Sequence, residues 1–175
     1  HLTIHSSRSR FAARLNSGVR AQMEHRAHAE HLGGLLGNLQ SLEFSIRLCL
    51  SQLPGSPARN LYTDDFRNAP VGTLIPESGM SSYASLGQLI KEFNGIFGQT
   101  GATVDPALVS LRDVLAHGRV FAGPDEMHFR IVKFDKPVNG SARLAYNQVM
   151  TEAWFVEGKR RVREAILTVM GRVEP

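Results

Sequence analysis

The sequence predicts a mainly α-helical fold, a four- to five-helix bundle with an inserted β-hairpin. Leucine-rich stripes recur at helical spacing on both sides of a proline-containing segment. Near residue 127 the pattern changes to short runs that favour strands, around the turn dipeptide Asn139-Gly140. A chain of 175 residues is long enough for one core, so we expect a single domain over 1–175 with the hairpin at about 127–149.

The first half of the chain predicts two helices. Residues 8–31 form a weak helical pattern rich in Arg and His, and Gly33-Gly34 predicts a break after it. Residues 35–53 carry the strongest helical pattern, which Pro54 ends. The apolar stripe of this second helix consists of Leu35, Leu39, Leu42, Ile46, Cys49 and Leu53.

A long irregular loop is expected next, because the segment 54–80 contains four prolines. Ser81 or Ser82 is expected to cap the following helix, which Gly98 and Gly101 stop. The apolar positions of this helix are Leu86, Leu89, Ile90, Phe93, Ile96 and Phe97.

Asp105-Pro106 predicts the start of another helix, with Asp105 as N-cap and Pro106 in the first helical position. Gly118 suits the position just after its C-terminus. Its core face consists of Leu108, Leu111 and Leu115.

The C-terminal part predicts a hairpin and a last helix. The runs 127–134 and 142–149 have the composition of strands, and Asn139-Gly140 fits the turn between them. Thr151 is expected to cap a final helix that runs to about Met170.

The composition is that of a globular protein, with 42% hydrophobic and 21% charged residues. Cys49 is the one cysteine, which excludes an internal disulfide and a multi-cysteine zinc site. No run of 18 apolar residues and no signal-peptide pattern occurs, so we expect a cytoplasmic protein with no membrane partner. The chain begins at His1, and we expect residues of the natural N-terminus to be missing. A net charge of +4 permits contact with nucleic acid without requiring it.

The most informative segment is RDVLAHG, from Arg112 to Gly118. Arginine binds phosphate through a rigid fork of donors, and histidine transfers protons near neutral pH. On one helix Arg112 and His117 differ by about 140° in direction, so two copies of the helix would have to meet for both side chains to converge on one phosphate. Asp113 is placed to orient either side chain. This combination of residues favours metal-free cleavage of RNA.

RDVLAHG resembles the signature of the HEPN superfamily, in which an arginine, a polar residue and a histidine lie on a late helix of a small bundle. The resemblance implies a HEPN-like helical domain and a metal-independent endoribonuclease of toxin–antitoxin or defence systems, without cofactor or metal. It implies a homodimer whose catalytic residues are Arg112, His117 and Asp113. It also implies RNA cleavage by 2′-hydroxyl attack, leaving a 2′,3′-cyclic phosphate, and a cognate antitoxin as a partner.

The alternative is a catalytically inactive HEPN-like module that binds a nucleotide, RNA or a protein. In that interpretation Arg112 is a surface charge paired with Asp113, and His117 is a polar helix end. The five-residue spacing alone does not discriminate, because it recurs in Arg20 with His25 and in Arg26 with His31. Both of those pairs have alanine after the arginine, so the context favours Arg112 and His117.

Basic residues suggest an RNA-binding surface. We expect it to include Arg119, Lys159, Arg160 and Arg163, with Arg161 in the same run on the last helix. A solvated helix face is the alternative for the last helix.

Two further groups have ordinary and functional interpretations. His25, His28 and His31 suit either an exposed helix face, which we favour, or a divalent metal. Glu43 needs a cationic partner, and Arg47 one turn later is favoured over Arg112.

Overall fold

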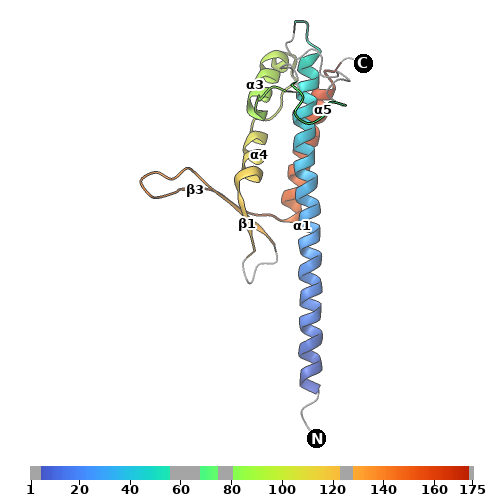
Figure 1. Cartoon of the computed structure of the whole chain (residues 1–175), viewed down its shortest axis with the longest axis vertical. Helices are drawn as coiled ribbons and strands as arrows, with labels where there is room; N and C mark the ends of the chain where they lie inside the picture. Colours follow the sequence, from blue (N-terminus) through green and yellow to red (C-terminus); the bar gives the residue numbers. More distant parts are fainter. Residues whose placement is uncertain (1–4, 56–67, 75–80, 123–127, 174–175) are drawn as a thin grey trace.

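The computed structural model describes residues 5–55, 68–74, 81–122 and 128–173, with side chains from Glu24 onward (Figure 1). This part of the chain is mainly α-helical with a small antiparallel sheet, as predicted. Its helices are α1 (His5–Ser51), α3 (Leu86–Phe97), the 3-10 turn η1 (Gly98–Thr100), α4 (Ala107–His117) and α5 (Glu152–Met170). Its strands are β1 (Arg119–Phe121), β2 (Arg130–Phe134) and β3 (Leu144–Val149). Among the described helices, none combines the length and the apolar character needed to cross a membrane.

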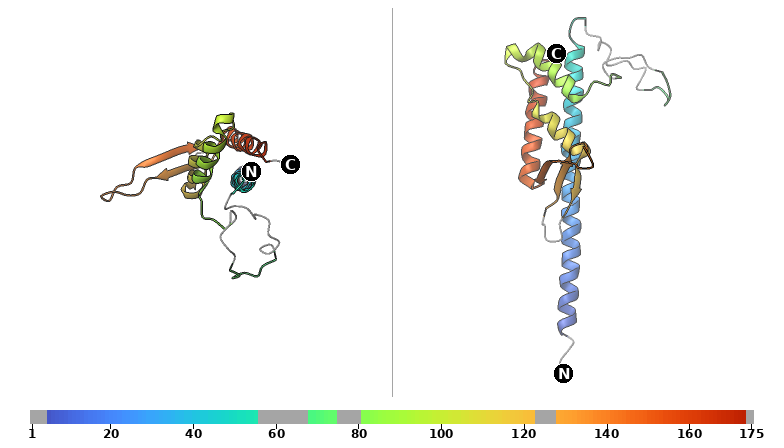
Figure 2. Two further views of the ribbon diagram at one scale, coloured as in Figure 1. Left: turned by 90° about the horizontal axis from the view of Figure 1, so that it is seen from above. Right: turned by 90° about the vertical axis from the view of Figure 1, so that its left-hand side faces the viewer.

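The predicted break at Gly33-Gly34 is wrong, because α1 runs through both glycines as one helix of 47 residues. Its C-terminal half lies beside α5 in both side views (Figures 1 and 2). A glycine inside a helix costs about 1 kcal/mol relative to alanine. Burial of the flanking leucines offsets that cost, since Leu35 and Leu39 are both in the core.

The core lies where α1, α3 and α5 meet. α1 contributes the predicted stripe from Leu35 to Cys49, and α5 approaches it closely at Gly158. A Cβ on Gly158 would lie 3.3 Å from the side chain of Leu35, so glycine permits the close approach of the two helices. The other fully buried large side chains include Ile90 and Phe93 of α3, Leu108 of α4, and Phe155, Val162 and Val169 of α5.

The cap of α3 is Ser85, and the expectation of Ser81 or Ser82 is wrong. Ser85 and Gln88 form a capping box in which each side chain accepts from the other residue's backbone N–H. The side chain of Ser82 does not cap α3; its hydroxyl oxygen accepts a hydrogen bond from Arg47 at 2.9 Å. Of the expected loop, residues 68–74 contain neither helix nor strand, while 56–67 and 75–80 lie outside the described residues.

Helix α4 starts one residue later than predicted. Pro106 occupies the N-cap position, and Asp105 caps the helix by accepting a hydrogen bond from the backbone N–H of Ala107 at 2.8 Å. Gly118 ends the helix as predicted, but with an extended backbone (φ −70°) instead of the left-handed one that glycine C-caps usually adopt. Glycine is therefore needed here for a reason other than its backbone freedom.

The predicted hairpin is one part of a three-stranded sheet of order β1-β2-β3. Asn139 (φ 51°) and Gly140 (φ 77°) form its tight turn, closed by two backbone hydrogen bonds between Val138 and Ser141. β1 was not predicted; it follows α4 directly and pairs with β2. The β2–β3 hairpin projects away from the helices (Figures 1 and 2). Thr151 caps α5 as predicted.

Candidate functional site

The C-terminal half of α4 carries the three candidate catalytic residues. Leu108 and Val114 are buried and fix the opposite side of the helix against the core. Arg112 and His117 are exposed, and Asp113 is partly exposed. The amphipathic pattern of this short helix thus presents all three side chains to solvent.

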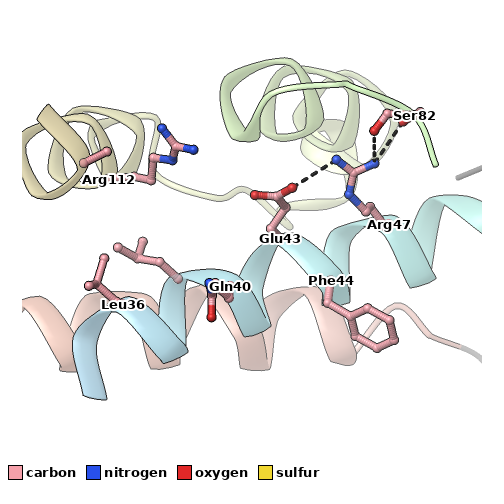
Figure 3. Close-up of a pocket in the computed structure, with 9 residues that line it drawn as sticks. Leu36, Gln40, Glu43, Phe44, Arg47, Ser82 and Arg112 are labelled. Atoms are coloured by element: carbon pink, nitrogen blue, oxygen red, sulfur yellow. Dashed lines mark hydrogen bonds and ion pairs between the residues drawn. The ribbon is translucent and has the colours of Figure 1, made fainter. Parts of the chain in front are cut away.

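Arg112 lines a groove of about 520 Å³ between α1 and α4. Figure 3 shows its side chain extending from α4 across from Glu43 and Arg47 of α1. The groove continues past Ser82 into a second hollow of about 550 Å³, which Asp113 also lines. Within the described residues the guanidinium of Arg112 makes no hydrogen bond or ion pair, so its donors are available to an anion.

Glu43 pairs with Arg47, as predicted, at 3.0 Å between Oε1 and Nη2. Arg47 is only 9% exposed. It donates further hydrogen bonds to the hydroxyl and carbonyl oxygens of Ser82 and to the carbonyl of Ala84. Arg47 therefore holds the segment before α3 against α1 through these hydrogen bonds, and it lines the side of the groove opposite Arg112.

His117 lies on the other side of α4 from this groove. Its side chain is 63% exposed, and its Nε2 lies 3.8 Å from Oδ1 of Asp113. The second oxygen of Asp113 is 2.5 Å from Nζ of Lys133 on β2. Asp113 therefore pairs with Lys133, not with Arg112, and its carboxylate is held near the imidazole. The sequence gives no local signal for Lys133, because the register of β2 brings it to α4.

Within one protomer Arg112 and His117 line different hollows. The hollow beside His117 has a volume of about 270 Å³ and is formed with Arg119, Phe134 and Asp135 of the sheet. This separation agrees with the difference in direction expected for residues five apart on a helix. One copy of the chain does not unite the two side chains in a shared cleft.

Of the predicted RNA-binding residues, the structure brings Arg119 to the site and leaves the α5 residues elsewhere. The guanidinium of Arg119 lies over the ring of Phe134, 5.4 Å from its centroid. On α5, Lys159 lies 3.3 Å from Nδ1 of His31, and Arg163 is exposed. Among the described residues, none of the three hollows along α4 is lined by Lys159, Arg160, Arg161 or Arg163.

Two of these α5 arginines are held by carboxylates. Arg160 lies between Glu157 and Glu164, whose hydrogen bonds raise the pKa of its guanidinium. Arg161 donates to Asp105 at 2.7 Å. This arrangement matches the solvated helix face that was the alternative interpretation.

The histidines of α1 contact aromatic rings. His28 lies 4.2 Å from the ring centroid of Phe129, and His31 stacks on Phe155 at 5.2 Å. Burial, followed by the charges of His25 and His31, lowers the pKa of His28. In the part of the chain that the structure describes, no group of three or more His, Cys, Asp or Glu is arranged to hold a metal ion.

No family model matches the chain, and neither a curated protein nor a solved structure matches it significantly. The resemblance to the HEPN superfamily therefore depends on the segment from Arg112 to Gly118.

Proposed function

We propose that this protein is a metal-independent endoribonuclease of the HEPN type, whose active site is completed by two copies of the chain. The observation that carries the proposal is the exposure of Arg112 and His117 on one short helix. The guanidinium has no partner among the described residues, and the imidazole has a carboxylate 3.8 Å away. We also propose that the fold is a HEPN-type helical bundle, that the protein is cytoplasmic, and that it has a toxin or defence role with a cognate antitoxin.

The chemistry needs a proton-transfer group and a cation. The 2′-hydroxyl of a ribose attacks the adjacent phosphorus, its proton passes to a base, and an acid protonates the leaving 5′-oxygen. His117 serves in proton transfer, a role that contributes about 10²–10⁴-fold in rate. Arg112 stabilises the negative charge that builds on the phosphoryl oxygens. Asp113, held by Lys133, fixes a negative charge beside the imidazole.

A second copy supplies what one protomer lacks. Because Arg112 and His117 lie on different sides of α4, the arginine of one copy and the histidine of the other can face one phosphate when two α4 helices meet. The surface beside Arg112 suits such a contact. Leu36 and Phe44 of α1 line the same groove and are 37% and 38% exposed.

The proposal is tested by RNA cleavage with purified variants. His117→Ala and Arg112→Ala should each abolish cleavage, whereas Lys91→Gln, an exposed change on α3, should leave it unchanged. EDTA should not inhibit, and the products should carry 2′,3′-cyclic phosphates. Cleavage that survives His117→Ala, or consistent 3′-hydroxyl ends, would refute the assignment.

The separation of the two hollows within one protomer favours a second candidate, a non-catalytic module that binds a nucleotide, RNA or a protein. This candidate predicts RNA binding without cleavage in EDTA and in magnesium, across several RNAs. A chain that remains monomeric at high concentration would also favour it, because the cleavage site would then never form.

A further inference from the structure

The sheet beside His117 has one face against the helices and one outer face. Residues paired across antiparallel strands lie on the same face, so the register assigns each side chain. Ile131 is buried beside Gly118, and Lys133 pairs with Asp113, which places their face against α4. The opposite face, called the outer face below, carries Arg119, Phe121, Arg130, Phe134 and Asn147, together with the buried Val132 and with Val149.

The outer face combines exposed aromatic rings with arginines. Phe121 is 47% and Phe134 39% exposed, although burial of an aromatic ring is strongly favourable. Arg119 stacks over Phe134, and Arg130 donates to the side chain of Asn147 at 2.7 Å. Exposed rings interleaved with arginines are the pattern with which proteins bind the bases and backbone of single-stranded nucleic acid.

The charge of this region complements a phosphate backbone. Residues 119–149 contain five Lys or Arg and three acidic residues, Asp125, Glu126 and Asp135, so the segment carries a net positive charge. Asp135 is paired with Arg143 at 2.7 Å, and Lys133 is paired with Asp113. Arg119 makes no ion pair with any described carboxylate, so its charge is available to a polyanion.

The outer face is continuous with the candidate catalytic histidine. His117, Arg119 and Phe134 line the same hollow of about 270 Å³, a size that accommodates a nucleobase. A base seated there would stack on the Arg119–Phe134 pair and bring its ribose toward the imidazole.

We infer that the outer face of the sheet is a binding subsite for single-stranded RNA, in which a base stacks on Phe134 and Arg119 beside His117. The inference rests on the proposed ribonuclease function for its choice of ligand. Single strands are required because the bases of an A-form duplex are stacked on one another and offer no free plane to a protein ring. The subsite would select unpaired loops or linkers as the substrate of the reaction.

The test measures the affinity of the full chain for a short single-stranded oligonucleotide with 2′-fluoro sugars, which cannot be cleaved because the attacking hydroxyl is absent. Phe134→Ala should weaken binding about 5- to 150-fold, the range found when a stacking ring is removed. Arg119→Gln should weaken it as well and reduce the dependence of log Kd on log salt by about 0.7. Phe134→Trp should retain the affinity, because it keeps an aromatic plane.

Matched controls lie on other elements. Leu167→Ala removes an exposed apolar side chain from α5, and Lys91→Gln removes an exposed charge from α3; neither should change the affinity. Circular dichroism and the melting temperature check that Phe134→Ala is folded, and Phe134→Leu provides a milder variant that should also weaken binding.

Unchanged affinity in folded Phe134→Ala would overturn the inference. So would equal affinity for a duplex of the same sequence, or a change in oligomeric state in place of a change in RNA binding. The two proposals fail separately. Cleavage of natural RNA that is insensitive to Phe134→Ala contradicts the subsite alone, whereas Phe134-dependent binding without any cleavage contradicts the nuclease alone.

Discussion

The end of α4 depends on the absence of a side chain at Gly118, and Gly118→Ala should destabilise the fold. A Cβ at this position would lie 2.4 Å from the carbonyl oxygen of Val114 and 2.7 Å from Cγ1 of Ile131. The carbonyl of Val114 already accepts the N–H of Gly118, and Ile131 is 1% exposed, so neither neighbour can easily move. The backbone angle of Gly118 suits any residue, and the cost is therefore steric.

The magnitude follows from overpacking. Inserting a methyl group into a well-packed site costs about 1–3 kcal/mol. For a domain of this size each kcal/mol lowers the melting temperature by about 2–4 °C, so we expect a decrease of roughly 2–12 °C. Gly33→Ala is the matched control, because a Cβ there meets nothing within 4 Å and the residue lies inside α1. That variant should be more stable by about 0.5–1 kcal/mol.

Thermal unfolding followed by circular dichroism, with urea unfolding as a second measurement, provides the assay. Unfolding of Gly118→Ala at the wild-type temperature would contradict the steric clash, and so would a loss of stability in Gly33→Ala as large as that in Gly118→Ala. Cleavage activity should fall in Gly118→Ala along with stability, because the added methyl group would displace the end of α4, which carries His117, relative to β1, which begins at Arg119.

Three further outcomes are expected. Because folding lowers the pKa of His28, the unfolded chain binds its proton more readily, and the free energy of unfolding should fall as the pH drops below about 6.5. His28→Gln should flatten this decline in urea titrations, and an identical decline in the variant would contradict the assignment. Asp105→Ala removes the cap on α4 and the partner of Arg161, and should cost about 0.5–2 kcal/mol, whereas Asp105→Asn, which keeps a capping oxygen, should cost less. Burial raises the pKa of the Cys49 thiol, so a thiol reagent should label it only in denaturant; rapid labelling of the native chain would show that α1 is not packed as described.

Local chemistry made several elements predictable from the sequence. Thr151 caps α5 through its own side chain, and Asn139-Gly140 turns the hairpin through its own backbone angles. The stripe from Leu35 to Cys49 is buried because its spacing matches the helical period. Each of these features depends on residues that are close in the chain.

The features that were missed depend on residues distant in the chain. Packing of α1 against α5 keeps the helix continuous through Gly33-Gly34. β1 is three residues long and exists by pairing with β2, so it carries no pattern of its own. The register of β2 likewise brings Lys133 to Asp113.

The candidate site was also predictable only where it depends on residues that are close in the chain. The segment RDVLAHG placed Arg112, Asp113 and His117 on the end of one helix, as the structure has them. The surroundings that decide their chemistry came from other elements. α1 forms the groove at Arg112, and the sheet forms the hollow at His117.

The central claim is that Arg112 of one copy and His117 of another act on the same phosphate. The most direct measurement mixes Arg112→Ala and His117→Ala chains, allows subunits to exchange, and follows RNA cleavage. Each variant alone should be inactive and the mixture should regain activity, because one of the two sites in each mixed dimer combines an intact Arg112 with an intact His117. A mixture that exchanges subunits and stays inactive, beside an active wild type, would contradict it.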